Sequence, residues 1–291
     1  MENKVLVVVG PTAVGKTALG VKLAHEFDGE IISGDSQQVY RGLDIGTAKV
    51  TPLEMEGVTH HLIDIREITE NFSAHDFVTA ANTAITDITA RGKLPIIVGG
   101  TGLYIQALIE GYHLGGEENH QQMQRLRETL ETLTNDELQS RLKQPLPEFN
   151  RRRAIRALEL ETYGSGENKP TGDEFCLIGL TTSREQLYER INLRAEKMID
   201  AGLLTEAELL YKNYRSVQAA KAIGYKEFFP YFAGDITLEE AVERLKQDSR
   251  HYAKRQLTWF RNRMKVDFID IFSPNFPENA IMIAKEFLKI S

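Results

Sequence analysis

The sequence predicts an α/β fold in which helices cover a parallel sheet, with a small helical insertion. Three observations support this expectation. Strand and helix patterns alternate through the first hundred residues, a glycine-rich loop joins the first strand to the first helix, and a polar, leucine-spaced segment interrupts the alternation after about residue 111. We expect ligands to bind at the carboxyl ends of the strands.

The strongest motif is the loop that follows the apolar strand over residues 4–9. Backbone N–H groups of such a loop and the free amides of the following helix surround the oxygens of a chain of phosphates. Lys16 adds a positive charge, and the Thr17 hydroxyl can hold Mg²⁺. We therefore expect a P-loop NTPase-like core that binds a di- or triphosphate. The loop leaves open whether a phosphoryl group is transferred, is hydrolysed or simply leaves. The loop consists of Gly10, Pro11, Thr12, Ala13, Val14, Gly15, Lys16 and Thr17.

Further core elements follow from hydrophobic periodicity and capping residues. Short apolar runs predict strands, and apolar residues at helical spacing after a capping serine predict helices. In chain order we expect a helix to about Phe27, a strand over 30–32, a strand over 61–65, a helix from Ser73 to Gly92, a strand over 94–98 and a helix from about Leu103.

The chain changes character after about residue 111. Residues 115–144 are polar with spaced leucines, which predicts a small helical insertion. We expect three segments: 1–111 as the first part of the core, 112–146 as the insertion and 147–291 as the rest of the core. The last segment is expected to contain a helix over 149–163, a strand over 175–180, a helix opened by a capping box of Ser183 and Gln186 and ended near Gly202, a helix over 238–264, a strand over 267–272 and a C-terminal helix.

Composition excludes several classes of protein. Hydrophobic residues make up 42% and charged residues 26%, as in ordinary soluble globular proteins. The single cysteine, Cys176, excludes a disulfide within the chain, and its apolar neighbours favour packing over catalysis. The chain starts directly with a strand and has no run of membrane-spanning length, so we expect a cytoplasmic protein without membrane association.

Charge is distributed unevenly along the chain. The net charge of −7 argues against bulk attraction to nucleic acid. Arginines nevertheless crowd residues 151–156, and a second basic cluster occupies 250–265. Each cluster is either a docking site for a polyanion or the solvated face of a helix, and taken alone neither cluster favours one over the other.

Two further segments are expected beside the phosphate loop, at the ends of neighbouring strands. Asp35 follows the strand over 30–32 and can accept a proton from a nucleophile or hold Mg²⁺, unless it only caps a turn. The strand over 94–98 ends in glycines and Thr101, with no carboxylate of the kind that holds Mg²⁺ in P-loop ATPases. This absence weakens the interpretation as an ATPase.

Arg194 lies at the edge of an apolar helical stripe formed by Leu187, Ile191 and Met198. An arginine in that position needs an anionic partner or must extend to solvent. Arg190 lies one turn earlier, so the pair can clamp a diphosphate. We expect Arg194 to be the main contact of the two.

A series of motifs spans almost the whole chain. They are the phosphate loop, Asp35–Tyr40, Asp44–Lys49, His61–Asp64, Gly99–Tyr104, Arg156–Glu159, Ala222–Glu227 and Tyr252–Trp259. In these motifs and their order the chain resembles the family of bacterial tRNA dimethylallyltransferases, also called tRNA isopentenyltransferases or IPP transferases. The segment before Arg151 is shorter than is usual in that family. This difference leaves open which of the arginines in 151–156 contacts RNA.

The resemblance implies transfer of the dimethylallyl group of dimethylallyl diphosphate to N6 of the adenine 3′ of the anticodon in tRNA, with release of diphosphate. It implies that Lys16, Thr17 and Arg194 hold the diphosphate with Mg²⁺, Thr17 being the metal ligand, and that Asp35 takes the N6 proton. The insertion would clamp the tRNA. On this interpretation the contacts with the anticodon stem-loop fall on Asp35, Ser36, Gln37, Gln38, Thr101, Arg152, Arg153, Arg156, Arg250, Lys254 and Arg255.

Three other functions share part of this pattern. They are a P-loop kinase for a small metabolite, a prenyltransferase that acts on free adenine nucleotides, and a nucleotide-dependent RNA-binding protein without catalysis. The basic helix and the insertion favour a large acceptor over a free nucleotide. Nothing in the sequence indicates an obligate protein partner.

Overall fold

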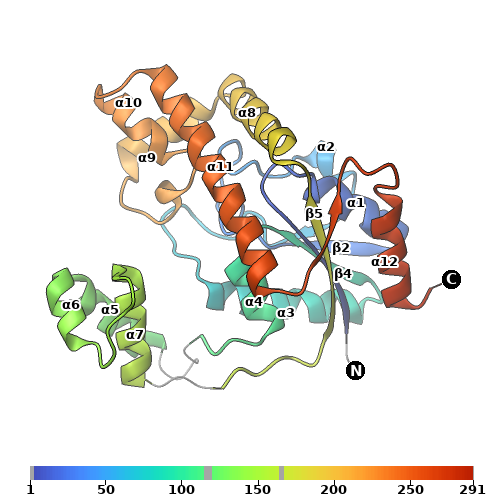
Figure 1. The fold of residues 1–291 in the computed structure, drawn as a ribbon, viewed down its shortest axis with the longest axis horizontal. Coiled ribbons are helices and arrows are strands. Elements are labelled where there is room, and N and C mark those ends of the chain that lie inside the picture. The colour runs from blue at the N-terminus through green and yellow to red at the C-terminus, as the bar shows by residue number, and fades with distance from the viewer. Residues whose placement is uncertain (1–2, 115–119, 164–166, 291) are drawn as a thin grey trace. The chain divides into compact units, whose positions relative to one another are not determined.

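A computed structural model describes residues 3–114, 120–163 and 167–290. The chain divides into two compact units, one formed by Met1–Ile109 together with Gly172–Ser291 and the other by Glu110–Thr171. We call them the core unit and the insertion unit. The core unit holds the sheet, and the insertion unit consists of helices (Figure 1).

The core unit is built on a six-stranded sheet whose strands pair in parallel throughout the described residues. The order is β3-β2-β4-β1-β5-β6, so the first strand of the chain lies inside the sheet. This arrangement confirms the expected α/β fold. The strands are β1 (Lys4–Val9), β2 (Gly29–Ser33), β3 (His60–His61), β4 (Leu94–Gly99), β5 (Glu174–Thr181) and β6 (Asp267–Asp270).

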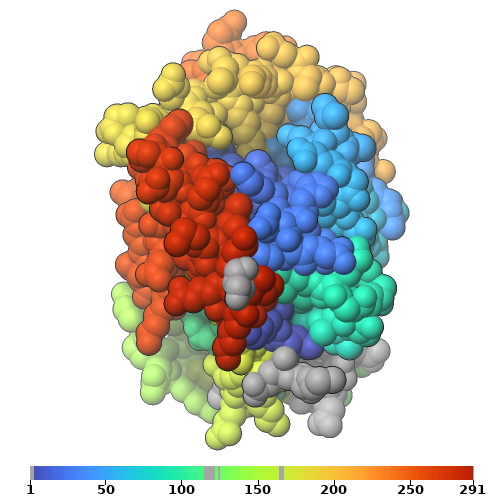
Figure 2. All heavy atoms as spheres, turned by 90° about the vertical axis from the view of Figure 1, so that its right-hand side faces the viewer, coloured from blue at the N-terminus to red at the C-terminus, as the bar shows by residue number. Residues whose placement is uncertain are grey.

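Helices cover both faces of the sheet, as the burial of β1 shows. Its odd-numbered residues belong to a cluster with side chains of α3 and α4, whereas Leu6 and Val8 belong to a cluster with side chains of α1 and α12. Figure 2 shows the second face, where α12 lies beside α1. The helices are α1 (Lys16–Glu26), α2 (Pro52–Met55), α3 (Ala74–Ala90), α4 (Gly102–Ile109), α8 (Arg184–Asp200), α9 (Leu203–Asn213), α10 (Phe229–Ala233), α11 (Leu238–Arg263) and α12 (Glu278–Leu288).

In the part of the insertion unit that the structure describes, three helices pack around a small apolar core. They are α5 (His120–Glu131), α6 (Asn135–Arg141) and α7 (Arg151–Tyr163), and their buried residues include Leu130, Leu138 and Leu158. The unit is therefore longer than the expected insertion of 112–146. Helix α7 belongs to it because the apolar face of that helix covers the leucines of α5 and α6.

Some local expectations were wrong. The strand expected over 61–65 stops at His61, because Leu62 (φ 63°) and Asp64 (φ 54°) have a left-handed backbone that a strand cannot contain. The strand expected to reach residue 272 ends at Asp270, whose side chain accepts a hydrogen bond from the Phe272 amide.

The expected capping box before α8 is only half formed. The Ser183 side chain accepts a hydrogen bond from the Gln186 amide, but the Gln186 side chain bonds to Thr182 instead of returning to Ser183. Helix α9 follows Gly202 and has no counterpart among the expected elements. Among the described residues, no helix combines the length and the apolarity needed to cross a lipid bilayer.

Candidate active site

The phosphate loop joins β1 to α1 and leaves the first amides of α1 without a side-chain cap. The residue at the cap is Gly15, whose φ of 98° lies in the left-handed region that favours glycine. Ala13 is also left-handed, with a φ of 65°. Left-handed residues placed between ordinary ones turn successive N–H groups toward one point, which creates a concavity for an anion. The loop thus has a backbone suited to phosphate oxygens.

Lys16 begins α1, and its Nζ donates a hydrogen bond to the carbonyl of Pro11 at 2.7 Å. Burial, followed by repulsion from Arg194, lowers the pKa of Lys16 to about 7, while the Asp35 carboxylate acts in the opposite direction. A polyphosphate at this loop would bring negative charge and raise the pKa again. The amine is therefore placed to gain a proton when an anion binds.

Helix α8 brings two arginines to the same loop. Arg194 Nη1 donates to Thr12 Oγ1 at 3.2 Å, and Arg190 Nε donates to the Ala13 carbonyl at 2.7 Å. Burial lowers the pKa of Arg194. Within the described residues its guanidinium takes part in no ion pair, although the charge of Asp35 acts on it. The two arginines therefore lie where a diphosphate clamp would need them.

Asp35 lies in the turn after β2. Its Oδ1 accepts hydrogen bonds from the amides of Gln37 at 2.8 Å and Gln38 at 3.4 Å, so the alternative role as a turn residue is realised. Its charge also acts on Lys16 and Arg194. Because both hydrogen bonds use Oδ1, the turn holds the carboxylate in place without occupying its second oxygen.

The ends of β2 and β4 meet with backbone against backbone. A Cβ at Gly99 would lie 2.3 Å from the carbonyl oxygen of Gly34, so only glycine fits there. Thr101 follows this contact, and its Oγ1 accepts a hydrogen bond from the Ser36 amide at 3.1 Å. The hydroxyl of Thr101 and the turn that carries Asp35 are therefore held together.

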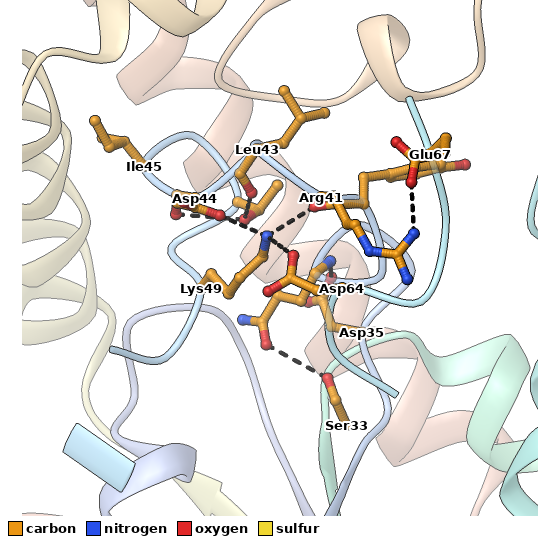
Figure 3. A network of polar contacts seen from close by, with 12 residues as sticks. Ser33, Asp35, Arg41, Leu43, Asp44, Ile45, Lys49, Asp64 and Glu67 are labelled. Carbon is orange, nitrogen blue, oxygen red and sulfur yellow. Dashed lines mark hydrogen bonds and ion pairs between the residues drawn. The ribbon is translucent and has the colours of Figure 1, made fainter. Parts of the chain in front are cut away.

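The two glutamines expected to contact tRNA differ in their surroundings. Gln38 is used inside the protein, since its Nε2 donates to the Ala48 carbonyl at 3.1 Å and its Oε1 accepts from Ser33 Oγ at 3.4 Å (Figure 3). Gln37 has a buried Oε1 with no hydrogen-bond partner in the part of the chain that the structure describes. Among the described residues, Gln37 is thus the one of the two whose side-chain oxygen is left without a donor.

Lys49 anchors the loop over residues 41–50, in the centre of Figure 3. Its Nζ donates to the Tyr40 carbonyl at 2.7 Å and forms ion pairs with Asp44 and Asp64, each at 2.6 Å. The side chain is 6% exposed. Because Gln38 reaches the same loop through Ala48, Lys49 helps to fix the segment that begins at Asp35.

Glu206 holds the same loop from α9. Its carboxylate accepts hydrogen bonds from the amides of Asp44, Ile45 and Gly46, at distances between 2.9 and 3.1 Å. The Tyr225 hydroxyl donates to it at 2.9 Å. Since no motif points to α9, no pattern in the sequence indicates this role of Glu206.

Helix α11 supplies a further contact that the sequence analysis missed. Gln256 is 5% exposed, and it bridges the amide of Thr12 and the carbonyl of Gly100 at 2.8 and 2.9 Å. A signal was present, because Gln256 shares helical spacing with the buried Ala253 and Phe260. A polar residue in an apolar stripe requires partners.

Comparisons with known proteins assign the chain to a protein family. The family model described as IPP transferase matches residues 38–263. The chain is 63% identical over 290 residues to a tRNA dimethylallyltransferase of Lactococcus lactis subsp. lactis, a match that covers 98% of this chain and 99% of that protein. The chain belongs to the IPP transferase family. The resemblance in the sequence motifs is therefore confirmed.

Further relatives of the chain bear names of the same kind. A tRNA dimethylallyltransferase of Streptococcus thermophilus is 57% identical over 292 residues, covering 99% of this chain and 98% of that protein. A solved tRNA isopentenylpyrophosphate transferase of Bacillus halodurans is 45% identical, with a TM-score of 0.77 over 99% of this chain and 98% of that one. A eukaryotic dimethylallyltransferase solved acting on tRNA has a TM-score of 0.80 and 29% identity, over 99% of this chain and 80% of that one.

The basic residues expected to contact tRNA are unequally available. On α11, Lys254 and Arg255 are exposed, whereas Arg250 donates to Asn192 Oδ1 at 2.7 Å. Within the insertion unit, Arg156 forms an ion pair with Glu159 at 3.1 Å. The exposed arginines of α7 are Arg152 and Arg153.

Proposed function

We propose that this protein moves the dimethylallyl group of dimethylallyl diphosphate to N6 of the adenine 3′ of the anticodon in tRNA and releases diphosphate. The observation that carries the proposal is the meeting of Lys16, Arg194 and Asp35 beside a strand, β4, that ends without a carboxylate. Such a site can hold a diphosphate and accept a proton. It lacks the acidic strand end on which ATP hydrolysis by P-loop ATPases relies.

The donor half of the reaction belongs to the phosphate loop. As the bond from carbon to the bridging oxygen breaks, its electron pair leaves with the diphosphate, and negative charge grows on that group. Lys16 and Arg194 lie at the loop and neutralise this charge, and the loop amides add hydrogen bonds. Arg190 extends the clamp from the turn of α8 before Arg194.

The acceptor half belongs to the turn after β2. The adenine amine is a weak nucleophile, because its lone pair is delocalised into the ring. As the new carbon–nitrogen bond forms, the amine must lose a proton, and the Asp35 carboxylate is the acceptor that the turn holds nearby. Thr101 and Gln37 are the polar groups beside it that a flipped nucleotide would meet.

Mg²⁺ fits the oxygen donors at this site. Among the described residues there is no cluster of three or more His, Cys, Asp or Glu side chains able to hold a metal. Mg²⁺ that binds phosphate oxygens keeps several waters and needs only one or two protein oxygens, so the Thr17 hydroxyl at the start of α1 suffices. The ion would add positive charge to the leaving diphosphate.

A large acceptor accounts for the exposed basic residues better than a free nucleotide does. Lys254 and Arg255 on α11, with Arg152 and Arg153 in the insertion unit, would meet RNA phosphates, and the insertion unit would clamp the tRNA. Because tRNA is the acceptor, we expect the enzyme to work in the cytoplasm.

The test measures labelled dimethylallyl groups in unmodified tRNA with Mg²⁺ and without ATP. We expect label in tRNAs that carry the target adenine and none in AMP or ADP. A product that requires ATP would favour a kinase instead. Label in free nucleotides would show that the acceptor is an adenine nucleotide and not tRNA. Binding of tRNA without any transfer would leave only an RNA-binding role.

A further inference from the structure

Gln256 joins two loops that belong to different halves of the site. Its Oε1 accepts a hydrogen bond from the Thr12 amide in the phosphate loop at 2.8 Å, and its Nε2 donates to the Gly100 carbonyl after β4 at 2.9 Å. The side chain is 5% exposed. An amide that is buried and bonded at both ends is held in one orientation, because the reversed amide would face each backbone group with the wrong partner.

Gly100 leaves the space that this bridge needs. A Cβ at residue 100 would lie 2.1 Å from Gln256 Nε2 and 3.4 Å from the carbonyl oxygen of Gly10. The first distance is too short for any real contact, whereas the second is ordinary. The absence of a side chain at Gly100 therefore provides the space that the Gln256 amide occupies.

The bridge continues to the acceptor side. Thr101, next to Gly100, accepts from the Ser36 amide, which follows Asp35. Tyr252 lies one turn before Gln256 on α11, and the side chains of Thr101 and Gln256 both act on its pKa, so its hydroxyl lies near both. Through the peptide bond between Gly100 and Thr101, the hydrogen bonds of Gln256 and Thr101 thus connect the phosphate loop to the turn that carries Asp35.

We propose that Gln256 is a positioning residue, which fixes the separation between the diphosphate at the phosphate loop and the acceptor beside Asp35 and Thr101. This inference rests on the proposed function. Gln256 contacts backbone groups and none of the reacting atoms. A misplacement of the reacting groups by about 1 Å can lower a rate on the order of 10²-fold, so the loss of the bridge acts on the transfer step more than on binding.

The first test replaces Gln256 by an apolar side chain of similar length. In Gln256→Met we expect the single-turnover transfer rate at saturating donor and tRNA to fall about tenfold or more, with the Kd of each substrate changed less than about threefold. Gln218→Met is the matched control, because the Gln218 Nε2 also donates to a backbone carbonyl, that of Phe72, at 2.8 Å. It should keep the wild-type rate.

The second test uses Gln256→Glu. A protonated glutamate can accept from Thr12 and donate to Gly100 as the amide does, whereas an ionised one sets a negative oxygen against the Gly100 carbonyl. Burial raises the pKa of such a carboxyl, and the charges of Lys16 and Arg194 lower it, with Tyr252 the other titratable group in contact. Dividing by the wild-type rate at each pH, from about pH 5 to about pH 8, removes the pH dependence that the variant shares with the wild-type protein.

We expect Gln256→Glu to transfer faster than Gln256→Met at low pH and to lose this advantage as the carboxyl ionises. Circular dichroism at each pH confirms that folded proteins are compared. Where Gln256→Met does not fold, the normalised rate of Gln256→Glu at low pH is compared with its own rate at high pH, and a rate that does not fall as pH rises overturns the inference. The inference is overturned if Gln256→Met transfers at the wild-type rate, or if Gln256→Glu shows no advantage at any pH. Absence of transfer by the wild-type protein would instead refute the proposed function.

Discussion

The guanidinium of Arg194 donates a hydrogen bond to the hydroxyl of Thr12 at 3.2 Å, so its partner in the phosphate loop is a neutral oxygen. Burial lowers the pKa of Arg194, because a cation away from water without a counter-ion is unfavourable. A bound diphosphate would supply the opposite charge. This relationship separates the site from a structural ion pair, in which the counter-ion belongs to the protein.

Replacing Arg194 by alanine should weaken use of the donor. Loss of one member of a buried charge pair costs about 2–5 kcal/mol, so we expect the KM for dimethylallyl diphosphate to rise on the order of 10²-fold. Steady-state kinetics at saturating tRNA measures this. Arg184→Ala, an exposed change on the same helix, is the control. An unchanged KM in Arg194→Ala would remove Arg194 from the diphosphate site.

Asp35→Asn separates the two roles of this residue. The asparagine oxygen can still accept from the amides of Gln37 and Gln38, so the turn is kept, but the proton acceptor is lost. We expect kcat to fall about 10²- to 10⁴-fold, with the KM of both substrates little changed. Asp35→Ala, which also loses the turn, should be slower still. Turnover of Asp35→Asn at the wild-type rate would assign the proton to another group.

The pKa of Lys16 gives a pH dependence of donor binding. In the free enzyme this pKa is about 7, so the amine is charged below that pH and loses its proton above it. Bound diphosphate raises the pKa, hence binding above pH 7 takes up a proton and affinity declines with rising pH. We expect kcat/KM for the donor to fall through about pH 7, and Lys16→Arg to lack this decline. A flat wild-type profile would contradict the buried, anion-sensitive amine.

Lys49→Met tests the anchor of the loop over 41–50. Removing the amine leaves the Tyr40 carbonyl without its donor, which costs about 1–3 kcal/mol. The ion pairs with Asp44 and Asp64 add little, because both carboxylates are well exposed. Urea unfolding measures the loss. The control is Arg41→Ala in the same loop, whose exposed pair with Glu67 contributes at most about 1 kcal/mol, so equal losses would contradict the anchoring role.

The pair of Gly100 and Gln256 predicts a coupling between mutations. In Gly100→Ala the new methyl group displaces the Gln256 amide, and in Gln256→Ala the amide is absent. We expect each single change to slow transfer, and the double change to be no slower than the worse single one, because both remove the same bridge. Single-turnover rates of the four proteins measure this. Multiplying losses would show that the two residues act separately.

The location of the site followed from the sequence because it depends on local and topological rules. A loop of small residues after a buried strand fixes Lys16, and neighbouring strand ends in a parallel sheet converge, which brings Asp35 and Thr101 near it. Helical periodicity marked Arg194 as an arginine beside an apolar stripe. These inferences need no knowledge of distant partners.

Other features depend on long-range contacts that no local pattern reveals. Glu206 serves the loop at Asp44 from a helix that was not expected, and Gln256 meets Thr12 across 244 residues of sequence. The expected contact of Arg156 with RNA stays a prediction, and the ion pair of Arg156 with Glu159, three residues away on the same helix, is a local one. The strand expected after His61 failed because a positive φ is invisible in an apolar pattern.

The carboxylate of Glu206 occupies a turn whose three successive amides would otherwise attract a phosphate of their own. With those amides bonded to Glu206, the turn at 44–46 has no free N–H groups to offer a second anion. The carboxylate of α9 thus takes, inside the protein, the place that a phosphate takes at a loop of this kind.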